Sequence, residues 1–232
     1  MAATAEMGMN FEQARFNMIE QQIRPWEVLD PEVLSLLALV RREDFVPDAH
    51  KALAFADLEL PIGAQGRDAS ACQTMLAPKI EARLLQEAGI RSTDTVLEVG
   101  TGTGYMAALL ASKAEYVYSV ESDPLLAEQA VKNLQQAGLA NVAVEVGDGS
   151  RGWAEHAPYD VIVISASLPV LPEEFLQQLK VGGRLVAIIG EEPAMEAQLI
   201  MRTEENAFNT INLFETVVAP LSNALQRQKF VF

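Results

Sequence analysis

The sequence predicts an α/β protein with a doubly wound, mostly parallel seven-stranded sheet. Short apolar runs of strand length alternate with helix-like segments through the middle of the chain, and this alternation is typical of a parallel sheet. These runs are Thr95–Val99, Tyr116–Val120, Val142–Val146 and Asp160–Ser165. Three glycines, Gly100, Gly102 and Gly104, follow the first run and indicate a tight strand-to-helix turn. Parallel sheets bind ligands at the carboxyl ends of their strands, so we expect the functional site there.

An N-terminal helical part precedes the sheet. Phe11–Ile23 has apolar residues at helical spacing, and Arg24-Pro25 ends it because the residue before proline avoids the helical region. Asp30-Pro31 is a helix start for a second apolar stripe, and Thr74–Ala88 has helical periodicity again. We expect a helical subdomain with a loop over residues 1–72 and an α/β domain over 73–232, packed as one compact unit because no flexible linker separates them.

The C-terminal part is predicted to close the sheet. Glu173–Leu179 is helix-like, and a Gly182-Gly183 turn leads into the apolar strand Arg184–Ile189. Two further strand-like runs, Ala197–Arg202 and Leu213–Leu221, are separated by the polar segment 203–212. We expect them to form an antiparallel hairpin added to the parallel sheet.

Composition narrows the function classes. The 232 residues carry a net charge of −15, which argues against binding to nucleic acid or to an anionic membrane surface. Cys72 is a single cysteine, and His50 and His156 lie far apart, so we expect no disulfide and no metal site. The absence of a signal-like N-terminus or a long apolar run predicts a cytoplasmic protein. The sequence does not predict the oligomeric state.

Carboxylates flank the glycine turn at informative distances. Glu98 precedes the first glycine by two residues, and Glu121 ends the next strand about 20 residues on, where nucleotide-binding folds place a ribose ligand. Tyr105 occupies the position where a dinucleotide fingerprint has its third glycine. This acidic-x-Gly-x-Gly-x-Gly pattern resembles motif I of class I S-adenosylmethionine (SAM) methyltransferases, and it favours SAM over NAD. A glycine turn without a ligand is the alternative interpretation.

Longer motifs identify a family. The chain resembles the protein-L-isoaspartate O-methyltransferases from about Met18 to Leu221. The matching segments are Glu20–Pro25, Phe45–Pro47, Leu60–Gly63, Glu98–Tyr105, Val117–Glu121, Gly147–Trp153 and Leu179–Val186. The resemblance implies SAM-dependent methylation of the carboxylate of isoaspartyl residues in damaged proteins, with S-adenosylhomocysteine as product, so we expect a protein or peptide carboxylate as acceptor.

The resemblance also assigns the cofactor site residue by residue. It implies that Glu121 holds the ribose and that Asp148 and Gly149 lie at the adenine. The cofactor turn would consist of Glu98, Gly100, Thr101, Gly102, Gly104 and Tyr105.

The acceptor loop departs from the family pattern Gln-Thr-Ile-Ser-x-Pro. Leu76 stands at the serine position, and the upstream segment 64–72 is several residues longer than in the family. Ser70, Cys72 and Thr74 are candidates to replace the missing hydroxyl. We expect Gly63–Cys72 to form a mobile lid. Two functions stay open, namely a methyltransferase with an altered acceptor site and a SAM-binding protein with a different acceptor or no catalysis.

Overall fold

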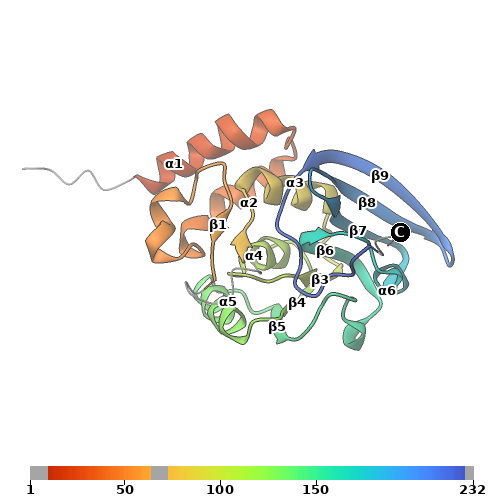
Figure 1. Ribbon diagram of the computed structural model, residues 1–232. Coiled ribbons are helices and arrows are strands. Elements are labelled where there is room, and N and C mark those ends of the chain that lie inside the picture. The colour runs from red at the N-terminus through yellow and green to blue at the C-terminus, as the bar shows by residue number, and fades with distance from the viewer. Residues whose placement is uncertain (1–9, 64–72, 228–232) are drawn as a thin grey trace, which may run out of the picture.

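The computed structural model describes residues 10–63 and 73–227. Seven strands form one sheet in the order β5-β4-β3-β6-β7-β8-β9 (Figure 1). The strands are β3 Thr95–Val99, β4 Tyr116–Glu121, β5 Val142–Val146, β6 Tyr159–Leu168, β7 Leu179–Glu191, β8 Ala194–Glu204 and β9 Ala207–Thr216. The first five in spatial order run parallel, and β8 and β9 add an antiparallel hairpin. The predicted α/β fold with its C-terminal hairpin is therefore confirmed.

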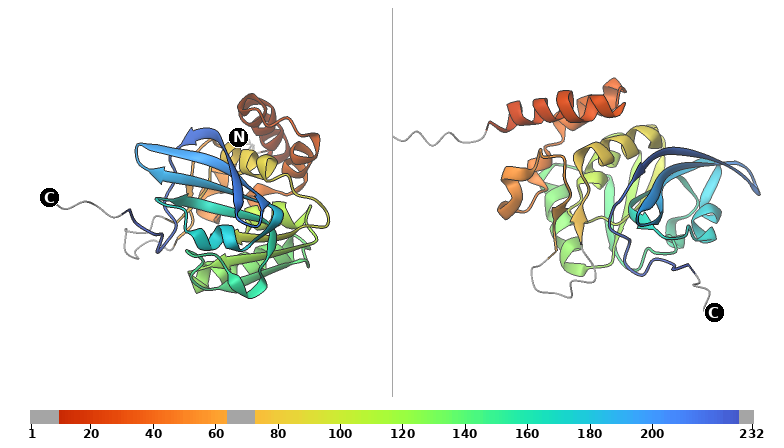
Figure 2. Two further views of the ribbon diagram at one scale, coloured as in Figure 1. Left: turned by 90° about the vertical axis from the view of Figure 1, so that its right-hand side faces the viewer. Right: turned by 45° about the horizontal axis from the view of Figure 1, so that its top comes forward.

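Helices cover both faces of the sheet, as the alternation of strand side chains requires. Val96 of β3 and Val161 of β6 pack under the helices α3 and α4, whereas their neighbours Leu97 and Ile162 face the side of α6. The helices are α1 Phe11–Met18, α2 Pro31–Leu39, α3 Pro78–Ala88, α4 Tyr105–Ala111, α5 Pro124–Gln136 and α6 Glu173–Gln177. The N-terminal helices pack against the face of the sheet that α3 and α4 cover (Figure 2).

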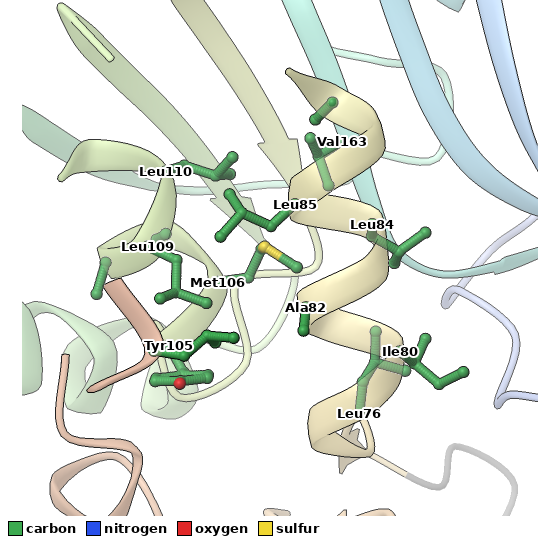
Figure 3. Packing of buried hydrophobic residues seen from close by; sticks show 14 of the residues in the cluster. Leu76, Ile80, Ala82, Leu84, Leu85, Tyr105, Met106, Leu109, Leu110 and Val163 are labelled. Atoms are coloured by element: carbon green, nitrogen blue, oxygen red, sulfur yellow. The ribbon is translucent and has the colours of Figure 1, made fainter. Parts of the chain in front are cut away.

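The two helices nearest the glycine turn pack closely. Leu85 of α3 and Met106 of α4 point into the space between these helices (Figure 3). All seven residues of α4 are buried, so this helix lies between the sheet and the N-terminal part of the chain. The glycine turn is thereby held on a rigid element.

The N-terminal segment is less regular than the sequence predicts. The helix α1 ends at Met18, and the chain continues through a π-helical turn, Ile19–Ile23, and a 3₁₀ turn, Arg24–Trp26. Asp30 caps α2 as predicted, because its Oδ1 accepts a hydrogen bond from the N–H of Glu32 at 2.8 Å. Further 3₁₀ turns are η3 Arg42–Asp44 and η4 Asp48–Leu53, with η5 Ala154–His156 later in the chain.

The predicted helix over Thr74–Ala88 begins four residues late. Thr74–Met75 is instead the short strand β2, which pairs antiparallel with β1, Leu60–Pro61. Ala77 is extended because it precedes Pro78, and the proline then occupies the first helical position. The expected domain boundary at residue 72 and the expected lid fall in or beside residues 64–72, which lie outside the described part of the chain.

The hairpin also differs in its boundaries. β8 and β9 join at the pair Glu204–Ala207, so residues 203–212 belong mostly to strands and not to a polar connection. Polar residues are tolerated there because β9 is an edge strand and is mostly exposed. Residues 217–221 leave the sheet, and Leu221 donates a hydrogen bond to the carbonyl of Ser167 on β6 at 2.8 Å. Within the described residues, no helix has the length and apolar character needed to cross a membrane.

Candidate active site

The glycine turn lies at the carboxyl end of β3, in the middle of the sheet. Gly102 has φ +55°, and a Cβ built on it would lie 2.9 Å from Cδ1 of Ile62. The left-handed backbone favours glycine at this position, and the end of the Ile62 side chain would have to move to admit a larger residue. Gly104 precedes α4 and faces the other way, where a Cβ would meet Ala130 and Leu134 of α5 at 3.3 Å.

A cavity of about 710 Å³ opens beside this turn, open solvent at its mouth included. The wall is formed by the glycine turn, the ends of β4 and β5, the segment 73–76, and the C-terminal segment 219–222. Lining residues are Ile62, Gln73, Thr74, Leu76, Val99, Gly100, Gly102, Val120, Glu121, Ser122, Leu126, Gly147, Asp148, Gly149, Ser165, Ala166, Ala219, Pro220, Leu221 and Ser222.

Glu121 ends β4 at the edge of this cavity. Its Oε2 accepts a hydrogen bond from the N–H of Gly102 at 2.8 Å, and its Oε1 accepts one from the N–H of Asp123 at 3.0 Å. The carboxylate thus ties the glycine turn to the start of α5. Oε1 also accepts a bond from the hydroxyl of Ser122 at 3.4 Å, whereas Oε2 has a lone pair left and can still accept a bond from a ligand hydroxyl.

Glu98 is fully buried beneath the turn. Ser119 donates a hydrogen bond to its Oε2 at 2.6 Å, and Ser165 donates one to its Oε1 at 3.0 Å. Burial raises the pKa of Glu98 to about 8, although these two hydroxyl groups lower it in part. Thr101 joins the network through its Oγ1, which lies 2.5 Å from the hydroxyl of Ser119. The network fixes the backbone that leads into the turn.

Asp148 and Gly149 follow β5 at the far end of the cavity. Asp148 accepts hydrogen bonds from the N–H of Ser150 at 2.9 Å and from Nδ2 of Asn223 at 3.2 Å. Burial opposes ionisation of Asp148, but these hydrogen bonds outweigh it and lower the pKa of the carboxyl group. A Cβ on Gly149 would lie 2.7 Å from Cγ1 of Val99, so a side chain there would disturb the cavity wall.

The predicted cofactor residues fall into three groups in space. Gly100, Gly102, Glu121, Asp148 and Gly149 all line the large cavity. A narrower crevice shares part of this lining. It is also lined by three further predicted residues, namely Glu98, Thr101 and Tyr105. Gly104 lines neither space and packs against α5.

The acceptor candidates are only partly visible. Ser70 and Cys72 lie outside the described residues. Thr74 lines the cavity, and its hydroxyl donates to Oε2 of Glu59 at 2.8 Å. Burial raises the pKa of Glu59, and the hydrogen bond from Thr74 lowers it in part. Leu76 also lines the cavity, with only 4% of its surface exposed.

Arg42 holds the segment that carries Leu76. The guanidinium group is completely buried, and it donates to the carbonyl of Ala54 at 2.9 Å and to the carbonyl of Leu76 at 2.7 Å. It also forms an ion pair with Glu81 of α3 and lies 5.1 Å from the ring centre of Tyr105. Burial raises the pKa of Glu81 to about 7 against the opposing effect of Arg42. One side chain therefore connects the acceptor segment with the helix that follows the glycine turn.

Sequence reasoning did not identify several of these residues as part of the site. Arg42 precedes Leu76 by 34 positions, Ser165 lies within β6, and the segment 219–222 belongs to an irregular C-terminal stretch. Neither periodicity nor a local motif singles them out. Other lining residues that were not singled out lay within stretches that the family resemblance covered, namely Ile62, Val99, Val120 and Gly147.

Comparison with known proteins identifies the relationship. The family model described as "Protein-L-isoaspartate(D-aspartate) O-methyltransferase (PCMT)" matches residues 13–226. A protein-L-isoaspartate O-methyltransferase of Protochlamydia amoebophila is 46% identical over 185 residues, covering 80% of this chain and 84% of that protein. Protein-L-isoaspartate O-methyltransferase 1 of Syntrophobacter fumaroxidans is 39% identical over 202 residues, covering 87% and 91%.

Solved structures agree with the sequence relatives. A protein-L-isoaspartate O-methyltransferase superposes with a TM-score of 0.78 at 26% identity, over 93% of this chain and 67% of that chain. A putative Plasmodium falciparum enzyme of this type, in complex with S-adenosyl-L-homocysteine, has the same fold, with a TM-score of 0.73 at 18% identity and coverage of 93% and 99%. The family model covers nearly the whole chain, and these sequence relatives are more than one-third identical to it. The chain therefore belongs to the protein-L-isoaspartate(D-aspartate) O-methyltransferase family.

Proposed function

We propose that this chain transfers the methyl group of SAM to the free α-carboxylate of isoaspartyl residues in peptides and proteins. The single observation that carries the proposal is the arrangement of the cavity. Its one wall is the glycine turn with Glu121, and its other wall is the segment with Thr74 and Leu76 that precedes Pro78. A cofactor wall and an acceptor wall thus meet in one space, in a member of this family.

The residues present fit SAM. Gly102 and Gly149 both line the cavity, and a Cβ at either position would contact Ile62 or Val99 in its wall. We assign Gly100 and Gly102 to the methionine end, Glu121 to the ribose hydroxyls, and Asp148 with Gly149 to the adenine. When bound, SAM supplies an electrophilic methyl group on a sulfonium. Glu98 acts beneath the turn, where its hydrogen bonds with Ser119 and Ser165 keep the turn in place.

Alignment is the main task of the acceptor wall. An isoaspartyl carboxylate is already ionised at neutral pH, so no general base is required to make it a nucleophile. Holding the carboxylate in line with the methyl group can lower the barrier by several kcal/mol. Arg42 contributes to this alignment as a positioning residue, since it fixes the carbonyl of Leu76 and thereby the backbone of the acceptor wall.

A second candidate function rests on Leu76. Its side chain cannot donate a hydrogen bond to a carboxylate, and an oriented donor is worth roughly 10²–10³ in rate where it is essential. In the described part of the chain, the nearby hydroxyl of Thr74 already donates to Glu59. This combination favours a protein that binds SAM and methylates a different acceptor, or none.

One experiment separates the two candidates. Labelled methyl transfer from SAM is measured on an isoaspartyl peptide and on the matched aspartyl peptide, and SAM binding is measured in the same sample. Base-labile label on the isoaspartyl peptide alone is the expected result, and it means that Leu76 is compatible with repair. Binding of SAM without transfer to either peptide would overturn the proposal and support the second candidate.

A further inference from the structure

Three potential metal ligands gather outside the cofactor cavity. Glu145 lies on β5, whereas Glu155 and His156 belong to the 3₁₀ turn η5. One ligand atom of each residue lies within 4.8 Å of those of the other two. None of the three lines the cavity assigned to the cofactor. The sequence argued against a metal site because His50 and His156 are far apart, but folding gives His156 two carboxylate neighbours instead.

The orientation of two of these side chains is already fixed. Nε2 of His156 lies 2.7 Å from Oε1 of Glu145, and the indole N–H of Trp153 donates to the other carboxylate oxygen of Glu145. The imidazole ring stacks on Tyr118, with ring centres 3.8 Å apart and planes at 11°. Outer contacts of this kind orient metal ligands, and prior orientation reduces the entropy lost on binding.

The charge of this cluster is not balanced by lysine or arginine. Within the described residues, Glu145 has His156 as its ion-pair partner, and neither Glu145 nor Glu155 pairs with a lysine or an arginine. A neutral histidine therefore leaves two carboxylates uncompensated on a chain whose net charge is −15. Both the local charge and the overall charge attract cations.

We propose that Glu145, Glu155 and His156 bind one divalent transition-metal ion of the zinc class. An imidazole nitrogen together with carboxylate oxygens suits Zn²⁺, Co²⁺ or Ni²⁺, whereas Mg²⁺ and Ca²⁺ prefer oxygen ligands throughout. When the metal binds Nε2 of the neutral His156 ring, the ring proton moves to Nδ1, and the metal replaces the hydrogen bond between Nε2 and Glu145. Water completes the coordination, because Glu155 is exposed.

The site would join the edge strand β5 to the turn η5. Trp153 lies between these elements, and its ring fills the space that a side chain on Gly147 would need. Gly147 lines the cofactor cavity, so the metal would brace one end of the cavity wall from outside. Because the ion binds the folded chain, it raises the midpoint of thermal unfolding.

The test uses the full chain without a polyhistidine tag, stripped of metal with a chelator. Zn²⁺ is titrated by calorimetry, and Co²⁺ is followed by its visible absorption. We expect saturation at one ion per chain and at least a tenfold loss of affinity in His156→Ala. Glu155→Gln, at an exposed position that leaves the fold intact, is expected to weaken binding several-fold.

Two control variants make the result specific. His50→Ala removes the other histidine, and Cys72→Ser removes the thiol, which would itself bind Zn²⁺. Both are expected to bind one ion with unchanged affinity. Unchanged affinity in His156→Ala, loss of binding in either control, or titration without saturation would each overturn the proposal. SAM binding by every variant verifies that the chains are folded.

Discussion

The two walls of the cavity are built in different ways. On the cofactor wall, Gly102 lies in the turn after β3 and Glu121 ends β4, and the N–H of Gly102 donates to the carboxylate of Glu121. On the acceptor wall, Leu76 is held through its carbonyl by Arg42, a buried side chain from a distant part of the sequence. The cofactor wall thus depends on local backbone geometry, whereas the acceptor wall depends on tertiary contacts. One wall can therefore change while the other is retained.

Arg42→Met tests the tertiary support of the acceptor wall and is expected to have the largest effect. The substitution leaves Glu81 buried without its cation, and breaking such a pair costs about 3–5 kcal/mol of unfolding free energy. In chains that remain folded, the KM for the isoaspartyl peptide should rise while the Kd for SAM stays nearly unchanged. Denaturant unfolding and a KM-against-Kd comparison measure the two effects.

The neighbouring arginine is the matched control. The side chain of Arg41 is 59% exposed. Its partners are the exposed Asp44 and the buried Glu43, and Glu43 keeps its ion pair with Arg15, so Arg41→Met should cost less than about 1 kcal/mol. The double variant Arg42→Met/Glu81→Met removes both charges and should regain most of the lost stability. A SAM affinity that falls as much as the peptide affinity in Arg42→Met would refute a role confined to the acceptor wall.

Gly102→Val tests the cofactor wall. The new side chain meets Ile62 and strains a backbone with φ +55°, so SAM affinity should fall about 100-fold, or about 2.7 kcal/mol. Gly138→Val is the control, because Gly138 has φ +74° but nothing within 4 Å of its Cβ position. That variant should lose stability from backbone strain and keep its SAM affinity. Equal affinities for SAM in both variants would remove Gly102 from the cofactor site.

Measuring stability against pH tests the buried Glu98, which lies beneath the glycine turn of the cofactor wall. The pKa of Glu98 is about 8 in the folded protein and near 4.5 in the unfolded chain, so the folded protein binds the proton more tightly. The contribution of this proton to the free energy of unfolding is therefore complete below pH 4.5 and is lost as the pH rises through 8. Glu98→Gln imitates the protonated carboxyl group. Between pH 5.5 and 7.5 the ligand-free wild type should lose about 2 kcal/mol more unfolding free energy than the variant does. Parallel losses in both chains would contradict the burial of Glu98 as an acid.

Leu76→Ser compared with Leu76→Ala gives the smallest expected effect and isolates one hydroxyl group. Both variants lose the buried leucine and a similar amount of stability, about 2–4 kcal/mol. Only the serine can donate to an acceptor carboxylate, so it should methylate the isoaspartyl peptide about tenfold faster than the alanine variant, equivalent to about 1.4 kcal/mol. Identical rates would mean that no donor is needed at this position.

The contrast between the walls also explains what the sequence could predict. Strand-like runs and turn glycines depend on local chemistry, so β3, β4 and the turn between Gly100 and Gly104 were predicted correctly. The hairpin was correct in type but displaced, because the polar residues of β9 face solvent and resemble a loop in composition. Helix α3 began late because Thr74 and Met75 pair with β1, a contact between segments that sequence periodicity does not reveal.

The site residues divide in the same way, into those set by local sequence and those set by contacts between distant segments. Five of the predicted cofactor residues line the cavity, including Glu121 and Asp148, because their positions are set by strand ends. The role of Arg42 could not be predicted, since a buried arginine resembles a surface arginine in sequence and only the fold brings it to Leu76. The proposed metal cluster is of the same kind, because ten residues separate Glu145 from Glu155.

The part of the cavity wall formed by residues 219–222 is synthesised after the glycine turn. Ala219 and Leu221 contribute to this wall and are fastened to β6 through Ser167, and they are synthesised after every strand of the sheet. A nascent chain can form the glycine turn long before this part of the wall exists. Full affinity for SAM therefore requires that synthesis has passed residue 221, and a chain that stops before residue 217 would be a methyltransferase fold with an open, weakly binding pocket.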